Sequence, residues 1–429
     1  MEIEEHLFRR ESGRLVAILT RLFGIQNLAL AEDVVQDAFC RALETWKYHG
    51  VPPNPSAWLM LVAKRRAVDV LRRQQTAREL EPELARFVES EWTLVPTVED
   101  AFDAGGVPDA QLRMMFSCVH PRLAEETQVA LILHLLCGFG MEETAAAFLK
   151  KPDAMEKRLQ RAKHLLAESR RLFDLAGTRD VTARLPAVLR ALYLLFNEGY
   201  HGASSESAVR AELCDEALRL VALLLDNPVT ATPAAHALAS LMSFLAARVR
   251  GRIDDAGNLV LLLDQDRSRW DCALMEQGRR ELALAATGDE LTAYHVEAAI
   301  ASLHAEARRA EDTNWAGIVS LYDTLFQIDS SPVVALNRAV AIAERDGAQR
   351  GLEEISRIGN SGRLAAYPFY FAALGELNLR LGRSVEAKAH FADAIKFARN
   401  PAEKQFLEQR LQRCDPRARP THRAHTQSH

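Results

Sequence analysis

Two stretches of the sequence are rich in the side chains that contact phosphate groups. Residues 58–78 contain six lysines and arginines against one aspartate, and residues 150–171 contain eight against three acidic residues. Between them, residues 79–109 carry nine acidic residues and one arginine. The net charge of the chain is −5, so its cationic character is local. Basic clusters are typical of nucleic-acid binding, although a solvated helix face explains either stretch equally well when it is taken alone.

Helical periodicity dominates the chain and predicts an all-α fold. Residues 30–46 place apolar side chains at three- and four-residue spacing, with Asp33, Gln36 and Asp37 on the opposite face. The segment HGVPPNPSAW ends this helix. Asn54 is suited to cap the next helix and Pro55 to open its first turn. We expect that helix to reach residue 75 with its arginine side chains pointing outward.

A second pair of helices is predicted inside residues 110–172. The sequence GFGMEETAAAFLKKPDAMEKRLQRAKHLL indicates a short helix at 142–148, a turn at 149–152 and a longer helix at 153–167. Asp153 is the expected N-cap of the longer helix. Two helices joined by a short turn, the second rich in lysine and arginine, form the helix-turn-helix pattern that reads duplex DNA.

From about residue 185 the sequence reads as a series of helices with few basic clusters. Residues 371–401 fit the tetratricopeptide template, in which small residues such as Gly375 and Ala387 let paired helices approach closely. Weaker matches begin at Trp315 and Leu336. The motif FNEGYHG, residues 196–202, either caps a helix through Gly199 or lines a ligand pocket, and the cap is slightly favoured.

The N-terminal 75 residues resemble domain 2 of extracytoplasmic-function (ECF) RNA polymerase sigma factors. The resemblance is carried by AEDVVQDAFCRALETW, a Pro-rich loop and NPSAWLMLVAKRRAVDVLRR. Residues 110–170, with EETA and KRLQRAK, resemble domain 4 of that family. The two matches cover about two fifths of the chain, and the remainder is similar to the helical tetratricopeptide-like extension of one subgroup.

The resemblance implies a domain order along the chain. A sigma domain 2 helical bundle occupies residues 1–78, an acidic linker 79–109, and a helix-turn-helix sigma domain 4 residues 110–172. A tetratricopeptide-like regulatory domain follows at 185–415, and a disordered tail at 416–429. The linker either mimics the charge of RNA near the exit path or is a flexible tether, and the sequence favours neither.

The resemblance also implies three functional sites. The residues expected to bind core RNA polymerase are Asp33, Gln36 and Asp37. Those expected at the minus-ten promoter element are Lys47, Tyr48, Asn54, Lys64, Arg65, Arg66, Arg72 and Arg73. Those expected at the minus-thirty-five element are Glu156, Lys157, Arg158, Gln160, Arg161 and Lys163.

Some of these residues have more specific expected roles. Lys157 and Gln160 match the hydrogen-bonding groups of purine edges in the major groove. Trp46 and Tyr48 are candidates for stacking on an unpaired base, whereas Trp58 is expected in the core. Arg65 stands where the family often has Asn, which leaves the sequence preference at minus ten open.

Other classes of protein fit less well. The sequence has no nucleotide-binding loop, metallopeptidase, hydrolase or CxxC motif, so we expect neither an enzyme nor a metal or other cofactor. A repeat scaffold that regulates transcription without sigma activity, and a dimeric helix-turn-helix activator, are the alternatives. The expected partners are core RNA polymerase and promoter DNA, and a small regulatory protein on the extension is a further candidate that no residue identifies. No run of 18 apolar residues is present, and we expect a cytoplasmic protein.

Overall fold

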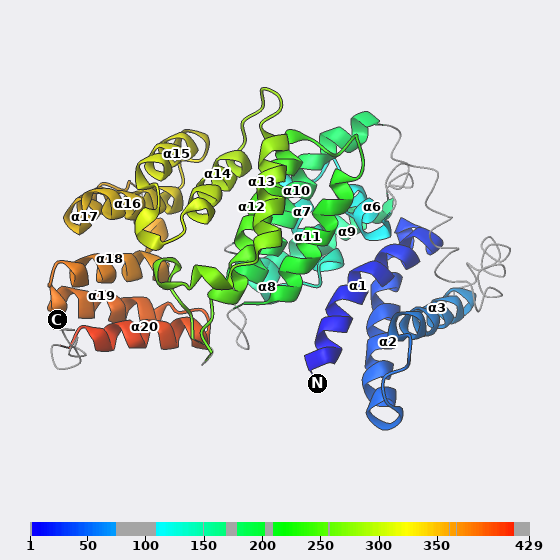
Figure 1. The fold of residues 1–429 in the computed structure, drawn as a ribbon. Helices are drawn as coiled ribbons and strands as arrows, with labels where there is room; N and C mark the ends of the chain where they lie inside the picture. The colour runs from blue at the N-terminus through cyan, green and yellow to red at the C-terminus, as the bar shows by residue number, and fades with distance from the viewer. Residues whose placement is uncertain are drawn as a thin grey trace. The chain divides into compact units, whose positions relative to one another are not determined.

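The computed structural model describes residues 2–73, 109–148, 150–168, 178–201, 209–255, 258–359, 361–365 and 367–415 (Figure 1). These residues are helical and contain no strand, apart from an isolated antiparallel bridge between Ile253 and Leu259. The predicted all-α fold is therefore confirmed for them. The predicted tail and all of the acidic linker except Asp109 lie outside them. No helix in these ranges is long and apolar enough to cross a membrane.

The chain divides into two compact units. Unit 1 comprises Met1–Phe196 and Asp215–Thr232, and unit 2 comprises Asn197–Cys214 and Pro233–His429. The predicted start of the extension at residue 185 thus lies inside unit 1. The helices of unit 1, the last two of which continue into unit 2, are α1 (Glu2–Phe23), α2 (Leu28–His49), α3 (Pro55–Arg73), α6 (Ala110–Cys118), α7 (Glu125–Leu136), α8 (Met141–Ala147), α9 (Pro152–Glu168), α10 (Thr178–His201) and α11 (Ala211–Leu225).

Helices α1, α2 and α3 form a bundle in which α2 packs against both neighbours. Most of the predicted stripe of α2 faces this core, with Val34, Val35 and Ala38 almost fully buried, but Leu43 of the same stripe is 50% exposed. Helix α2 extends beyond the predicted range at both ends and stops before Gly50, whose φ of 76° favours glycine. The Asn54 side chain accepts a hydrogen bond from Ala57 N at 3.0 Å, which confirms it as the cap of α3.

Helices α6 to α9 form the second part of unit 1. Helix α7 contacts α6, α8 and α9. Its sequence, EETQVALILHLL, is buried from Thr127 to Leu133, which places it at the centre of these four helices. Arg219 of α11 adds an ion pair to Asp109 at 3.2 Å, just before α6 begins. Residues 215–232 are therefore tied to this part of the chain.

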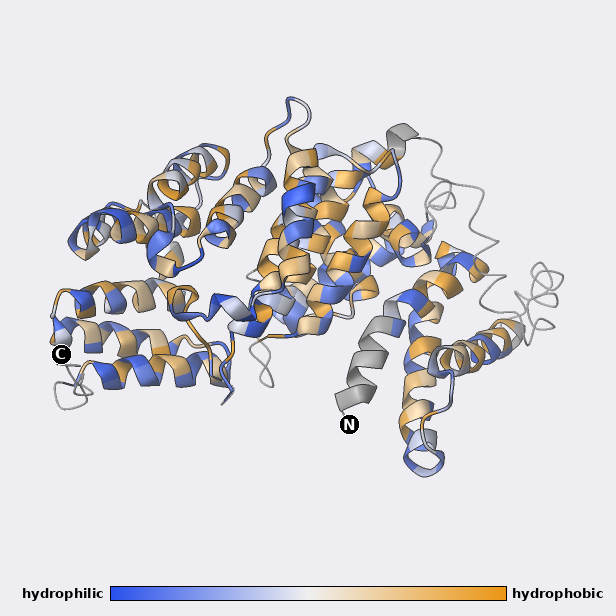
Figure 2. Cartoon of the chain, viewed as in Figure 1, coloured by the Kyte–Doolittle hydropathy of each residue, from blue (hydrophilic) through white to orange (hydrophobic). Residues whose placement is uncertain are grey.

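Unit 2 is a run of helices that mostly contact their neighbours in sequence. Its helices are α12 (Pro233–Ala247), α13 (Cys272–Ala285), α14 (Ala293–Glu306), α15 (Trp315–Ile328), α16 (Pro332–Asp346), α17 (Ala348–Ser356), α18 (Pro368–Arg380), α19 (Ser384–Lys396) and α20 (Pro401–Arg413). Hydrophobic and hydrophilic residues occupy different sides of most of these helices, whereas α12 is hydrophobic nearly all round (Figure 2). Three successive apolar clusters join α14–α16, α16–α18 and α18–α20. This arrangement resembles a stack of repeats, in which each unit buries its core against the next.

Two glycines of unit 2 mark close helix contacts. A Cβ added at Gly375 of α18 would lie 3.0 Å from the ring of Phe391 in α19, which agrees with the expected close approach. The tetratricopeptide assignment itself stays a prediction. Gly199 lies within α10 and does not cap it, so the favoured expectation was wrong. A Cβ there would lie 2.8 Å from Arg210 O and from the backbone of Cys214, so Gly199 instead permits the close approach of this segment.

Candidate functional site

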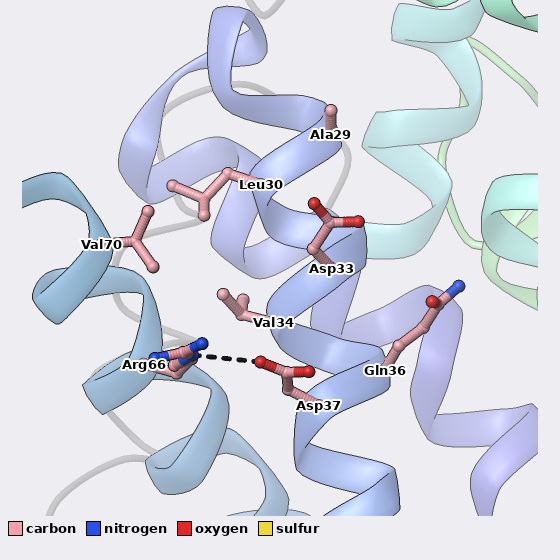
Figure 3. Close-up of a pocket in the computed structure, with 8 residues that line it drawn as sticks. All are labelled: Ala29, Leu30, Asp33, Val34, Gln36, Asp37, Arg66 and Val70. Atoms are coloured by element: carbon pink, nitrogen blue, oxygen red, sulfur yellow. Dashed lines mark hydrogen bonds and ion pairs between the residues drawn. The ribbon is translucent and has the colours of Figure 1, made fainter. Parts of the chain in front are cut away.

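The face of α2 opposite its buried stripe carries the residues predicted to bind polymerase. Asp33, Gln36 and Asp37 are all exposed. With Arg66 of α3 they border a surface hollow of about 560 Å³ (Figure 3). Its remaining lining residues are Ala29, Leu30, Val34 and Val70. The fold therefore places the predicted polymerase-binding residues beside the basic helix α3.

One ion pair joins the two helices across this hollow. Arg66 Nε lies 3.0 Å from Asp37 Oδ2, and the Gln36 side chain points away from α3 (Figure 3). The two paired side chains are 37% and 52% exposed. A pair this exposed stabilises the fold by about 0–1 kcal/mol. Asp37 can therefore exchange Arg66 for a cationic partner on another protein at little cost.

The predicted minus-ten residues occupy different environments. Lys47, Tyr48, Asn54 and Arg65 are exposed. Lys64 is only 3% exposed, because it lies on the inner side of α3 between apolar turns. The fold therefore does not expose Lys64 for the phosphate contact that was expected of it. Arg72 and Arg73 belong to α3, but their side chains lie outside the described part of the structure.

The aromatic residues at the end of α2 divide between core and surface. Trp46 is 4% exposed, and its ring centroid lies 5.5 Å from that of Trp58. Trp46 is therefore a core residue in this structure, which contradicts its expected role in stacking. Tyr48 is 78% exposed with Lys47 Nζ 5.9 Å from its ring centroid, so it can still meet an unstacked base.

Helices α8 and α9 lie close to the two predicted ranges and contact each other, and their role as a DNA-reading helix-turn-helix stays a prediction. Met155, Leu159 and Ala162 are buried, as the periodicity predicts. Helix α9 begins at Pro152, so Asp153 lies in the first turn and is not the N-cap. Leu149 in the turn lies outside the described residues.

The basic surface of α9 has two parts. Glu156, Lys157, Gln160 and Arg161 are exposed. The Gln160 amide donates to Glu156 at 3.3 Å, a long and easily replaced hydrogen bond. Their polar groups are therefore accessible from solvent.

The remaining two cations of α9 are engaged with acidic residues. Arg158 forms an ion pair with Glu126 of α7, and its hydrogen bond lowers the pKa of that carboxyl group. Lys163 Nζ lies 2.6 Å from Glu32 Oε1 of α2. Burial raises the pKa of Glu32 even though Lys163 opposes the shift. Sequence reasoning missed Glu32, because no periodic pattern connects residues 131 positions apart.

The contact between Lys163 and Glu32 belongs to a packing of α1–α3 against α6–α9, which we call the closed arrangement of unit 1. Helix α1 contacts α6 and α7, and α9 contacts α2 and the turn before it. A Cβ added at Gly13 of α1 would lie 2.1 Å from Leu136 O at the end of α7. The helix backbones therefore meet without an intervening side chain. Among the described residues, no group of three or more His, Cys, Asp and Glu side chains is placed to hold a metal ion.

Comparison with known proteins defines the class of the N-terminal segment. Residues 7–77, which span α1–α3, match the model of sigma-70 region 2, and residues 184–286 match a family of unknown function, DUF6596. The chain is also 27% identical over 164 residues to RNA polymerase sigma factor CarQ of Myxococcus xanthus, which covers 38% of this chain and 87% of that protein. Together, these findings support a sigma-factor role.

A second relative matches nearly the whole chain. The uncharacterized protein R00370 of Rhizobium meliloti (strain 1021) is 37% identical over 402 residues, which is 93% of both chains. The chain belongs to the same family as that protein. No solved structure matches the chain.

Proposed function

We propose that the chain is a cytoplasmic sigma factor of the ECF class that binds core RNA polymerase, recognises and melts specific promoters and directs initiation. The observation that carries this proposal is the exposed face of Asp33, Gln36 and Asp37 beside the basic helix α3, within a segment that matches sigma-70 region 2. Carboxylates on a fixed helix face steer encounter with a cationic surface and set its orientation.

Promoter contact is assigned to two surfaces. At the minus-ten element, Lys47, Arg65 and Arg66 supply phosphate contacts and Tyr48 a stacking group. At the minus-thirty-five element, Lys157 and Gln160 reach base edges and Arg161 reaches phosphate. Lys64 and Arg158 are engaged within the fold, so we leave them out of the proposed interfaces.

Simultaneous binding of both elements requires the closed arrangement to open. The element names place them about 25 base pairs apart, which is roughly 85 Å of duplex. Helix α9 is only about 26 Å long and contacts α2. A 35-residue connection at 74–108 can span about 115 Å when extended. Opening therefore breaks the ion pair between Lys163 and Glu32 and frees Lys163 for DNA.

The proposed polymerase contact is tested by charge reversal on α2. Asp33→Lys combined with Asp37→Lys should abolish binding of the full chain to purified core polymerase and, with it, run-off transcription from a promoter library. Glu44→Lys is the matched control, because Glu44 is an exposed carboxylate on the same helix outside the hollow. Unchanged core binding by the double variant would refute the assignment.

The same assay separates sigma activity from the alternatives. A repeat scaffold would leave core polymerase without start-site selection in every promoter tested. A dimeric helix-turn-helix activator would bind duplex DNA tightly in the absence of core. A sigma factor gives promoter-specific transcripts only when both proteins are present.

We further propose that the extension sets this activity, in place of a separate inhibitor. A truncation to test this should end after Thr232, because residues 215–232 belong to unit 1 and Arg219 is ion-paired with Asp109. The shortened factor should then change promoter output at equal core binding. Identical output from the full and shortened chains would remove this part of the proposal.

A further inference from the structure

Three arginines of unit 2 surround two aromatic rings. Arg248 and Arg252 flank the short turn after α12, and Arg267 and Trp270 lie in the segment before α13. Arg248 Cζ lies 5.8 Å and Arg267 Cζ 5.0 Å from the Trp270 ring centroid. Arg252 Cζ lies 4.0 Å from the ring centroid of Tyr200, near the end of α10. We call these five residues the arginine cluster.

The arginine cluster contains buried donors that have no acceptor. Arg248 is 6% exposed and Trp270 is 4% exposed. Within the described part of the chain, the Nε atoms of Arg248, Arg252 and Arg267 and Nε1 of Trp270 are buried without a hydrogen-bond partner. The nearby acceptors in the same state are Oε1 of Gln265 and, in one tautomer of the neutral ring, Nδ1 of His304. A buried donor left unsatisfied costs about 1–3 kcal/mol, and more when it is charged. The local excess of donors is therefore large.

Positive charge in the cluster has little compensation, since the carboxylates of Asp312 and Glu311 act on Arg267 without forming an ion pair. No carboxylate among the described residues forms an ion pair with Arg248, Arg252 or Arg267. Arg267 is held instead by the carbonyls of His304 at 2.7 Å and Ala307 at 2.6 Å. Buried cations without partners are strongly unfavourable in a folded protein.

Neighbouring titratable groups report the same imbalance. Burial, followed by the charges of Arg248 and Arg267, lowers the pKa of His304 to about 3. The pKa of Tyr200 is lowered although burial raises it, because Arg248 and Arg252 favour the phenolate. The charges that lower these two pKa values are all guanidinium groups, whereas Cys214 opposes the shift at Tyr200.

We propose that the arginine cluster binds a small oxyanion of the phosphate class. Such an anion offers several acceptor oxygens, which match guanidinium groups and an indole N–H. The burial of Arg248 and Trp270 favours a small ion over a nucleic-acid backbone or an acidic peptide. This site is separate from the polymerase and promoter surfaces and does not depend on the proposed function.

Bound anion would join parts of unit 2 that are distant in sequence. Tyr200 comes from the motif FNEGYHG, Arg248 and Arg252 from the end of α12, and Arg267 and Trp270 from DQDRSRWD. An anion held by all three segments would stabilise unit 2, and above the Kd the stabilisation would grow with the logarithm of the anion concentration. The extension would thereby respond to the supply of a phosphate-type metabolite.

The test measures phosphate binding to the full chain at constant ionic strength. Isothermal titration calorimetry with inorganic phosphate should give one site per chain. The midpoint of thermal unfolding should rise by about 3–6 °C at ten times the Kd. Parallel titrations with AMP distinguish a free phosphate ion from a phosphorylated small molecule. AMP will bind only if the site also has room for its nucleoside.

Arg248→Met is the decisive variant and Arg250→Met is its matched control. Arg250 is exposed and lies two residues away, so its loss should leave binding unchanged. Arg248→Met should weaken phosphate binding at least tenfold. Without phosphate it should be no less stable than the parent chain, because it removes an unpaired buried charge and keeps the side-chain volume. Equal phosphate affinity in the parent and Arg248→Met proteins, or no affinity of the parent for phosphate or AMP, would overturn the proposal.

Discussion

Charge reversal at Glu32 is the sharpest test of the closed arrangement. Glu32→Lys places a second ammonium group beside Lys163, whose Nζ now lies 2.6 Å from Glu32 Oε1. Two like charges about 4 Å apart repel by roughly 1 kcal/mol in water and about 4 kcal/mol at the effective dielectric near a protein surface. The side chains are only 17% and 23% exposed, which favours the upper half of that range. The equilibrium constant for opening should rise between about fivefold and several hundredfold.

Loss of the carboxylate without charge reversal should raise the equilibrium constant for opening much less. Burial raises the pKa of Glu32 despite the nearby Lys163, so the ionised carboxylate gains little from this site relative to water. Glu32→Gln removes that buried charge and keeps an oxygen acceptor for Lys163. It is therefore the near-neutral control. Exchanging the charges, with Glu32→Lys and Lys163→Glu together, should restore the closed arrangement.

Opening can be followed by energy transfer between dyes on α2 and α9. Cys40 is exposed on α2 and can be labelled directly, and His164→Cys provides an exposed position on α9. Cys272 is exposed and needs replacement by Ser, whereas the other cysteines are buried. Transfer should fall in Glu32→Lys and recover in the charge exchange. The same transfer efficiency in all variants would show that this ion pair does not hold the two helix groups together.

Three further substitutions test other contacts. Gly13→Ala should destabilise the closed arrangement, because its Cβ would lie 2.1 Å from Leu136 O, and the same energy-transfer assay should show increased opening. Gly375→Val should lower the free energy of unfolding of unit 2 by about 1–3 kcal/mol in denaturant titrations, because its side chain would overlap the Phe391 ring; an unchanged midpoint would refute that packing. The pKa of His304 is lowered from 6.5 to about 3 in the folded state. Between these two pH values the unfolded chain binds a proton that the folded chain does not, so the free energy of unfolding should fall as the pH falls from 6.5 towards 3. The free energy of unfolding should change by up to about 1.4 kcal/mol per pH unit, and by less in His304→Gln, as measured by thermal unfolding across that range.

Local signals in the sequence predicted the helices well. The stripe of α2, the cap at Asn54 and the buried positions of α9 all depend on residues within one or two turns, and the structure confirms them. The N-cap of α9 was predicted two positions too late, at Asp153, because Pro152 is itself a good first residue of a helix. The start of the extension was harder to predict, because residues 215–232 belong to unit 1 although residues 197–214 before them belong to unit 2.

Side-chain environment was predicted less reliably than helix position. Basic residues on an amphipathic helix are expected to face outward, yet Lys64 is buried, and Trp46 is buried where a stacking role was expected. Lys64 lies among the buried positions of α3, and Trp46 lies at the end of the buried stripe of α2. At such positions the neighbouring helix decides exposure, and its location is not encoded in the local pattern.

The contacts on which the proposed opening and the proposed anion site depend join residues far apart in the chain. Lys163 meets Glu32 across 131 positions, and the arginine cluster draws on three separate segments of unit 2. In both places a charge is buried without full compensation: the pKa of Glu32 is raised, and Arg248 has no carboxylate in the described structure. Uncompensated buried charge stores free energy that a partner or ligand can release. The ion pair between Lys163 and Glu32 therefore fits the proposed opening of unit 1, and the arginine cluster fits the proposed anion site.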